Sequence, residues 1–375
     1  MNEATDPGSA TTRAPLDTQL ACIVLAAGAG TRMRSTRPKA LHLLCGRAML
    51  LHVLDRLADL HAGQAVVVVG HGGERVADKV RADGPRALPI DVAEQTIRAG
   101  TGDATKVGLG LVPDDRDDLD VLVVHGDQPL VRASTLQQLV DRHRATGAAA
   151  TVLTARLPDP TGYGRVVRDR DGRVASIVEE RDATSDERAI VETNTGFYCF
   201  KRSLLAPALR RIRPDNHAGE LYLTDVVKVL SGAGHPVESV EAADPGEMLG
   251  VNDRVQLAAA ESELRRRTNA AWMARGVTML DPASVLVDTA VELGSDVTLF
   301  PGTILQGSTS IGEGSEIGPD AHLVDVVVGR GCRVRVTTAE GATIGDGADV
   351  GPYAYLGKGG EVPPGAVTGP FYTPA

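Results

Sequence analysis

Closely spaced cysteine pairs are absent from this sequence of 375 residues. The four cysteines lie far apart, and no CxxC spacing occurs among Cys22, Cys45, Cys199 and Cys332. This spacing argues against a zinc site or a redox dithiol and favours structural thiols. Long hydrophobic runs are also absent, because no stretch approaches the roughly 18 apolar residues of a membrane helix.

An excess of basic residues is missing too. Lys and Arg number 39 against 49 Asp and Glu, which gives a formal net charge of -10. This balance argues against broad nucleic-acid binding, although a local basic cluster can still bind a small anion. Residues 1–19 lack the apolar core of a signal peptide, and we predict that they form a disordered polar tail. We therefore expect a cytoplasmic protein that has neither a membrane nor a nucleic acid as its partner.

What is present between residues 21 and 250 is an alternation of two patterns. Short apolar runs, CIVLAA, AVVVVG, VLVVHGD and AATVLTA, are each bounded by Gly or Asp. Between them, residues 48–60 and 134–144 have apolar positions at helical spacing, with Ser134 as a suitable N-cap. Continuous apolar runs fit strands that are buried on both faces, so the pattern predicts an α/β domain with a mostly parallel sheet.

A six-residue repeat begins at Val285. Small or β-branched residues recur at Val285, Val291, Val297, Thr303, Thr309, Ser315 and Ala321. Aliphatic residues follow two positions later at Val287, Leu293, Leu299, Leu305, Ile311, Ile317 and Leu323, and after a shift at Ile344, Val350, Leu356 and Val362. This period predicts a β-helix with three short faces per coil. Between the two regimes, an Ala- and Arg-rich stretch predicts a long connecting helix over residues 252–276.

A glycine loop follows the first apolar run, in the stretch CIVLAAGAGTRMRSTRPKALHLL. It is not GxGxxG, because Met33 occupies the third position, and it is not a P-loop. Gly28 and Gly30 would let backbone N–H groups approach a ligand, and a helix starting near the loop would add its positive end. Four cations, Arg32, Arg34, Arg37 and Lys39, could neutralise a polyphosphate. On spacing alone, a solvated surface loop remains an equal alternative.

LAAGAGTRM followed by RPK resembles the sugar-nucleotide pyrophosphorylases. More narrowly, the chain resembles the uridylyltransferase half of the bacterial bifunctional family that combines N-acetylglucosamine-1-phosphate uridylyltransferase with glucosamine-1-phosphate acetyltransferase. Further motifs occur in the family's order between about residues 20 and 357: GHGGE, AGTGDA, GDQPL, DPTGYGR, IVEERDAT, ETNTGFY, GELYLTD and GVNDRVQL. The resemblance implies a Rossmann-like nucleotidyltransferase domain over residues 20–251, a connecting helix over 252–276 and a truncated left-handed β-helix over 277–375.

The resemblance also implies roles for individual residues. Those expected at the nucleotide are Leu25, Ala26, Ala27, Gly28, Gly30, Gln95, Gly100 and Thr101, with Gln95 on the uracil. Arg32 and Lys39 are the expected catalytic residues on the triphosphate, and Asp127 and Asn252 the expected ligands of Mg²⁺. Those expected at the sugar are Gly164, Glu179, Asn194, Tyr222 and Thr224. Arg34 and Arg37 are left as surface charges.

Each of these residues also has a purely structural interpretation. Asp127 follows a buried strand at the sheet edge where α/β folds bind ligands, but it could equally form a turn before Pro129. The other structural alternatives are an N-cap for Asn252, a hairpin turn around Tyr163, a solvated charge for Glu179 and a surface amide for Gln95.

We expect Mg²⁺-dependent transfer of a uridylyl group from UTP to N-acetylglucosamine 1-phosphate, giving UDP-N-acetylglucosamine and pyrophosphate. The alternatives are another sugar 1-phosphate or nucleotide, such as glucose 1-phosphate or TTP, and a catalytically silent scaffold. The resemblance implies a homotrimer, which a short β-helix would weaken.

The sequence departs from the family in two places. Gly357, in YLGKGG, stands where the family's RLRPG has its acetyltransferase arginine, and the chain ends at Ala375, so we expect no acetyl transfer. His125 stands where the family commonly has tyrosine, and we interpret it as a neutral residue beside the nucleotide pocket rather than a base.

Overall fold

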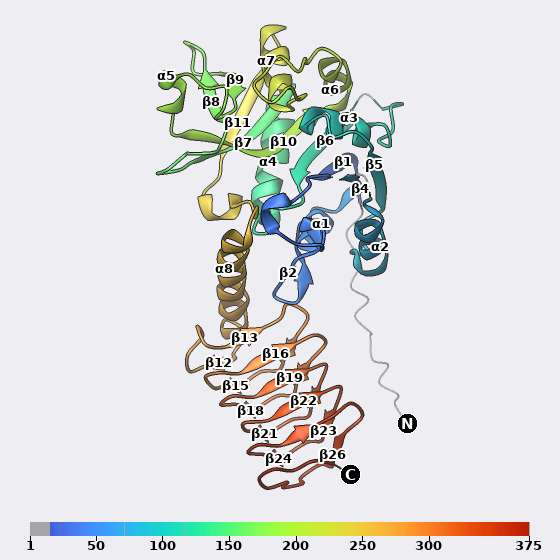
Figure 1. Cartoon of the computed structure of the whole chain (residues 1–375), viewed down its shortest axis with the longest axis vertical. Helices are drawn as coiled ribbons and strands as arrows, with labels where there is room; N and C mark the ends of the chain where they lie inside the picture. Colours follow the sequence, from blue (N-terminus) through green and yellow to red (C-terminus); the bar gives the residue numbers. More distant parts are fainter. Residues whose placement is uncertain (1–15, 71, 117, 375) are drawn as a thin grey trace, which may run out of the picture. The chain divides into compact units, whose positions relative to one another are not determined.

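The computed structural model describes residues 16–70, 72–116 and 118–374, which group into two compact units (Figure 1). The sheet unit comprises the residues through Ala29 together with Val53–Met248. The solenoid unit comprises Gly30–His52 together with Leu249–Ala375. The chain therefore enters the solenoid unit early, with a segment that nothing in the sequence pattern indicates.

The sheet unit is built on a nine-stranded, mostly parallel sheet, as predicted. Its main path runs β11-β7-β10-β6-β1-β4-β5, and only β10 lies antiparallel to its neighbours along that path. These strands are β1 (Asp17–Ala26), β4 (Ala62–Gly70), β5 (Ile90–Gln95), β6 (Asp120–His125), β7 (Ala150–Arg156), β10 (Glu192–Lys201) and β11 (Val237–Glu241). A short pair, β8 (Arg165–Arg168) and β9 (Val174–Val178), extends from β10. All four predicted apolar runs form strands of this sheet.

Helices cover both faces of the sheet, which explains the continuous apolar runs. The helices between these strands are α1 (Met49–Asp59), α2 (Glu74–Asp83), α3 (Thr101–Leu109), α4 (Ala133–Thr146), α5 (Ser185–Arg188), α6 (Arg202–Leu209) and α7 (Thr224–Gly232), with a 3-10 turn η3 (Pro245–Met248). One core joins alternate strand residues, such as Ile23 and Val121, to α3, α6 and α7. The strand residues between them, such as Cys22 and Leu122, are equally buried.

Two expectations for this unit need correction. Strand β1 begins at Asp17, inside the segment predicted as a tail, and residues 1–15 lie outside the described residues. Ser134 does not cap α4, which begins one residue earlier at Ala133. Instead, the buried carboxylate of Glu247 accepts hydrogen bonds from the backbone N–H of Arg132 (3.0 Å) and the hydroxyl of Thr135 (2.7 Å). Glu247, which lies 115 positions from Arg132 and 112 from Thr135, thus accepts hydrogen bonds from donors at the start of α4.

The solenoid unit begins with the segment that carries the loop cations. Two 3-10 turns, η1 (Thr31–Met33) and η2 (Lys39–Leu41), precede a hairpin of β2 (Leu43–Leu44) and β3 (Arg47–Ala48). Helix α8 (Arg254–Met273) is the predicted connecting helix, and Asp253 caps it by accepting a hydrogen bond from the N–H of Gln256. The hairpin is bound to α8, because the N–H of Cys45 donates to the Glu261 carboxylate over 2.7 Å.

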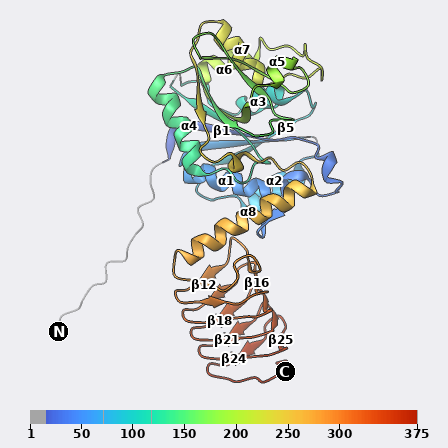
Figure 2. The ribbon, with the colours of Figure 1, turned by 90° about the vertical axis from the view of Figure 1, so that its left-hand side faces the viewer.

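The six-residue repeat folds into three parallel sheets of five strands, as expected for a left-handed β-helix (Figures 1 and 2). The first sheet holds β12 (Thr278–Met279), β15 (Thr298–Leu299), β18 (Glu316–Ile317), β21 (Arg333–Val334) and β24 (Asp349–Val350). The second holds β13 (Leu286–Val287), β16 (Ile304–Gln306), β19 (His322–Val324), β22 (Thr338–Glu340) and β25 (Tyr355–Leu356). The third holds β14 (Glu292–Leu293), β17 (Ser310–Ile311), β20 (Val327–Val328), β23 (Thr343–Ile344) and β26 (Glu361–Val362).

The register of these sheets explains the repeat. Val287 pairs with Leu305 and Leu305 with Leu323, so one coil is three six-residue units long. Both predicted sets of residues are buried, and their apolar members form one continuous core. The shift in the repeat arises where the chain shortens three corners, because Val328, Ala339 and Ile344 each follow the preceding inward residue by five positions instead of six. In the described part of the chain, no helix is long and apolar enough to cross a membrane.

Candidate functional site

An open pocket of about 340 Å³ lies in the sheet unit, where β1, β5 and β6 end. Its lining includes seven of the predicted site residues: Leu25, Ala27, Gly28, Gln95, Gly100, Thr101 and Asp127. The carboxyl ends of parallel strands form the ligand-binding edge of an open α/β sheet. Two predicted nucleotide residues, Ala26 and Gly30, are not among the lining residues, and Gly30 belongs to the solenoid unit.

Gly28 leaves the pocket open at the glycine loop. A Cβ atom added at Gly28 would meet nothing within 4 Å, so no neighbouring protein atom requires a glycine there. The adjoining Ala27 is packed closely, since a Cβ atom at Gly70 would lie 2.8 Å from the Ala27 carbonyl oxygen. The loop is therefore held against β4 while its outer edge stays free for a ligand that approaches the backbone.

The segment from Gln95 to Thr101 is fixed on the opposite side of the pocket. Gln95 is buried, and its amide donates to the Gly100 carbonyl (3.1 Å) and the Asp103 carboxylate (2.8 Å). The interpretation of Gln95 as a surface amide is therefore wrong. The hydroxyl of Thr101 accepts a hydrogen bond from the N–H of Leu223 (3.0 Å), which ties the start of α3 to the GELYLTD segment.

Asp127 lies in the turn that follows β6, and a residue that the sequence analysis did not single out holds this turn. The buried amide of Gln128 donates to the carbonyl oxygens of Thr195 (2.8 Å) and Met248 (3.1 Å). His125 lies against β10, where a Cβ atom at Gly196 would come within 2.7 Å of its ring. The glycine at 196, with φ of 86°, thus makes room for the histidine that replaces the family's tyrosine.

Of the two expected metal ligands, Asp127 belongs to the sheet unit and lines the pocket. Among the described residues, no group of three or more His, Cys, Asp or Glu side chains could hold a metal ion. Mg²⁺ instead takes one or two carboxylates together with phosphates and waters, which the carboxylate of Asp127 at the pocket fits. Asn252, the second expected ligand, belongs to the solenoid unit.

The five predicted sugar residues come together around Glu179. The Thr224 hydroxyl donates to the Glu179 carboxylate (3.2 Å), and a Cβ atom at Gly164 would lie 3.6 Å from the same group. Asn194 donates its N–H to the Gly164 carbonyl (2.8 Å). Burial raises the pKa of Glu179, and burial together with the Asp182 and Glu179 charges raises the pKa of Tyr222. Glu179 is therefore not a freely solvated charge.

The four loop cations lie in the solenoid unit and differ in their surroundings. Arg32, Arg34 and Arg37 are exposed, whereas Lys39 is half-buried and donates to the Asn252 side-chain oxygen over 2.8 Å. The expected helix near the loop is only the three-residue turn η1, so little helix dipole is available there. Asn252 does not cap α8, because Asp253 does; its side chain faces Lys39 instead.

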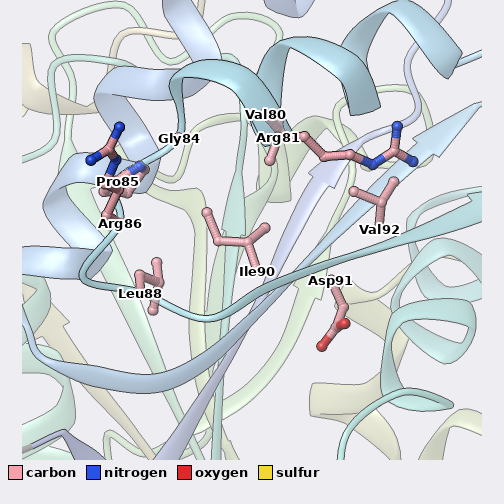
Figure 3. Close-up of a pocket in the computed structure, with 9 residues that line it drawn as sticks. All are labelled: Val80, Arg81, Gly84, Pro85, Arg86, Leu88, Ile90, Asp91 and Val92. Atoms are coloured by element: carbon pink, nitrogen blue, oxygen red, sulfur yellow. The ribbon is translucent and has the colours of Figure 1, made fainter.

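A second pocket in the sheet unit is larger than the one that contains the predicted site residues. A pocket of about 390 Å³ lies between α2 and the edge strand β5, lined by Val80, Arg81, Gly84, Pro85, Arg86, Leu88, Ile90, Asp91 and Val92 (Figure 3). Ile90 and Val92 point toward α2 and Asp91 points away from it (Figure 3). Arg81 pairs with Asp78 of its own helix over 2.7 Å. None of the predicted site residues lines this hollow, so the smaller pocket is the candidate site.

Comparisons with known proteins identify the family of this chain. The nucleotidyl transferase family matches residues 21–273. The chain is 49% identical to the bifunctional protein GlmU of Rhodococcus opacus over 345 residues, which cover 91% of this chain and 69% of the relative. It is 47% identical to the proteins of the same name from Streptomyces avermitilis and Mycolicibacterium smegmatis, over 90% and 91% of this chain and 70% and 71% of theirs.

Proposed function

The chain belongs to the nucleotidyl transferase family and, within it, to the bifunctional GlmU proteins, and from this premise we propose its reaction. It transfers a uridylyl group from UTP to N-acetylglucosamine 1-phosphate and releases pyrophosphate. The observation that carries the proposal is the convergence of the predicted nucleotide residues and Asp127 on one pocket. The sugar group around Glu179 adjoins it through the hydrogen bond between Thr101 and Leu223, next to Thr224.

The reaction is an in-line displacement. An oxygen of the sugar 1-phosphate, already ionised at neutral pH, attacks the α-phosphorus of UTP and forms a new P–O bond. The bond from that phosphorus to the oxygen bridging to the β-phosphate breaks, and pyrophosphate leaves with the electron pair. No covalent intermediate and no general base are required, so the protein contributes orientation and neutralisation of charge.

The residues of this chain divide that work. Arg32 and Lys39 hold the phosphates of UTP, and Gln95 holds the uracil. Glu179 and Asn194 bind the sugar hydroxyls and fix the direction of attack. Mg²⁺, when bound, supplies further neutralisation of phosphate charge, and Asp127 and Asn252 would hold it.

Pyrophosphate release from a substrate panel tests this proposal. The protein is incubated with UTP or TTP, with N-acetylglucosamine 1-phosphate or glucose 1-phosphate, and with Mg²⁺ or a chelator. We expect release with UTP and N-acetylglucosamine 1-phosphate and its loss on chelation. Release confined to glucose 1-phosphate or to TTP would favour the alternative substrates. No release with any pair would favour a scaffold protein.

A separate assay tests acetyl transfer, which we propose is absent. Gly357 follows β25 and occupies the place of the family's acetyltransferase arginine, so it offers no guanidinium to a substrate. With glucosamine 1-phosphate and acetyl-CoA we expect no free thiol of CoA above the background without protein. Release of CoA that depends on the protein would overturn this part of the proposal.

A further inference from the structure

The cationic loop, residues 30–39, has little regular structure to hold its own shape. Its bonds within the segment are short-range, such as the N–H of Arg34 to the Thr31 carbonyl (3.1 Å) and the N–H of Arg37 to the Ser35 hydroxyl (3.1 Å). Most of its residues are exposed. Groups that neutralise a transition state must nevertheless be fixed in place before the reaction begins. The position of this loop therefore depends on contacts outside it.

The start of α8 supplies such contacts. Arg254, the first residue of the helix, donates from Nε to the Met33 carbonyl oxygen (3.2 Å). Its Nη1 lies 3.3 Å from Nδ1 of His42. Met33 is 1% exposed, so its backbone is a firm anchor point. One guanidinium thus bridges both ends of the stretch from Met33 to His42, which contains Lys39.

We propose that Arg254 is a positioning residue, which holds the cationic loop by its bonds to Met33 and His42 so that Arg32 and Lys39 meet the phosphates. This inference rests on the proposed function. Arg254 touches no substrate in this role and acts only through the loop.

The chemistry of the contact suits arginine. A guanidinium presents several N–H donors in a rigid fork, so it can bind two separate acceptors at once, whereas a lysine ammonium is a compact charge on a flexible stem. His42 can accept only when Nδ1 carries no proton. Burial, together with the nearby charges of Arg254 and Arg37, lowers the pKa of His42 and favours that neutral form.

A purely structural role for Arg254 would lie in starting α8, and other groups already do this. Asp253 accepts the N–H of Gln256 (2.9 Å), and the Gln256 side chain accepts the N–H of Asn252 (2.7 Å). Arg254 is also exposed, so its truncation should change stability little. These features separate positioning from folding in an experiment.

The test compares Arg254→Met and Arg254→Lys with Arg266→Met. Arg266 lies on the same helix and pairs with Glu263 of that helix (2.8 Å), which makes it a matched control. We measure kcat in the forward direction and KM for pyrophosphate and for the sugar nucleotide in the reverse direction. Wild-type turnover is measured first, because its absence would contradict the proposed function rather than this inference.

For Arg254→Met we expect kcat to fall about tenfold or more and KM for pyrophosphate to rise about fivefold. KM for the sugar nucleotide should change less than about twofold, because the loop holds the leaving phosphates. For Arg254→Lys, both kcat and the KM for pyrophosphate should lie between the values of Arg254→Met and those of wild type. A loss of folded protein would lower kcat but leave both KM values unchanged. An unchanged KM for pyrophosphate, or the same change in Arg266→Met, would overturn the inference.

Discussion

At the scale of single residues, Arg32 is the sharpest test of the proposed site. It is the middle residue of η1, is exposed, and is the loop arginine that the resemblance assigns to the triphosphate. Removing one donor that stabilises charge in a transition state typically costs about 100- to 1,000-fold in kcat. We expect a loss of that size in Arg32→Ala, measured as pyrophosphate release under saturating substrates.

The control for Arg32→Ala is Arg34→Gln, which removes an exposed arginine of the same loop. We expect its kcat to stay within about threefold of wild type, since an exposed charge outside the site contributes little. The unfolding midpoint of both variants should match that of wild type. Near-normal turnover in Arg32→Ala would show that Arg32 is not a catalytic residue.

Single residues also show what the sequence could and could not predict about the site. The predicted residues Gln95, Gly100 and Asp127 do line one pocket. Asp127 follows a short apolar run, so the sequence places it at the end of a strand, and the family motifs indicate the other two residues. The buried support of Gln128 was not predicted, because its partners Thr195 and Met248 are 67 and 120 positions away. A polar side chain that binds distant backbone leaves no local periodic signal.

At the scale of elements, an ion-pair network joins α4 to two strands of the sheet. Arg144 of α4 donates to Asp17 of β1 (2.8 Å) and Asp120 of β6 (2.7 Å). Burial works to raise the pKa of Asp120, but hydrogen bonds from His143 and Arg144 outweigh it and hold that pKa below its ordinary value. A carboxylate with a lowered pKa stabilises the fold above its unfolded pKa of about 4 and loses this contribution as the pH falls.

We therefore expect Arg144→Met to lower the free energy of unfolding by about 1–2 kcal/mol at pH 7, because it removes the guanidinium that pairs with the buried Asp120 carboxylate. The difference from wild type should shrink as the pH falls below about 4, where Asp120 becomes protonated. Urea unfolding at a series of pH values measures both effects. Arg142→Met is the control, because Arg142 forms an exposed pair with Glu238. Its substitution should lower the free energy of unfolding by about 0.5 kcal/mol or less. A difference that is constant with pH would contradict the role of Asp120.

The elements themselves were predicted with uneven success, for a physical reason. Apolar runs and the six-residue repeat predicted the strands of the sheet and the three faces of the β-helix, since burial imposes those patterns locally. The hairpin of β2 and β3 was not predicted, nor was its attachment to α8. That attachment depends on Cys45 and Glu261, which are 216 positions apart.

At the scale of the whole molecule, the three sheets of the β-helix differ in the row of residues that precedes each inward aliphatic. In the sheet of β12, β15, β18, β21 and β24, this row includes Glu316, Arg333 and Asp349. In the sheet of β14, β17, β20, β23 and β26, it includes Glu292 and Glu361. The row of the remaining sheet holds no acidic, lysine or arginine residue and consists of Leu286, Ile304, His322, Thr338 and Tyr355. Its nearest acidic neighbour within the strands is Glu340, at the end of β22.

This uncharged row marks the sheet where we expect a homotrimer to form. Charged residues are depleted at the centres of protein interfaces, and stacked coils give each subunit a continuous strip of contact. Wild type should therefore have about three times the chain mass of 39.2 kDa in analytical ultracentrifugation. Ile304→Asp should shift the protein toward monomer, because a carboxylate would be buried in the contact. Thr298→Asp, on the charged sheet, should leave the mass unchanged. A monomeric wild type, or equal dissociation by both variants, would contradict this assignment.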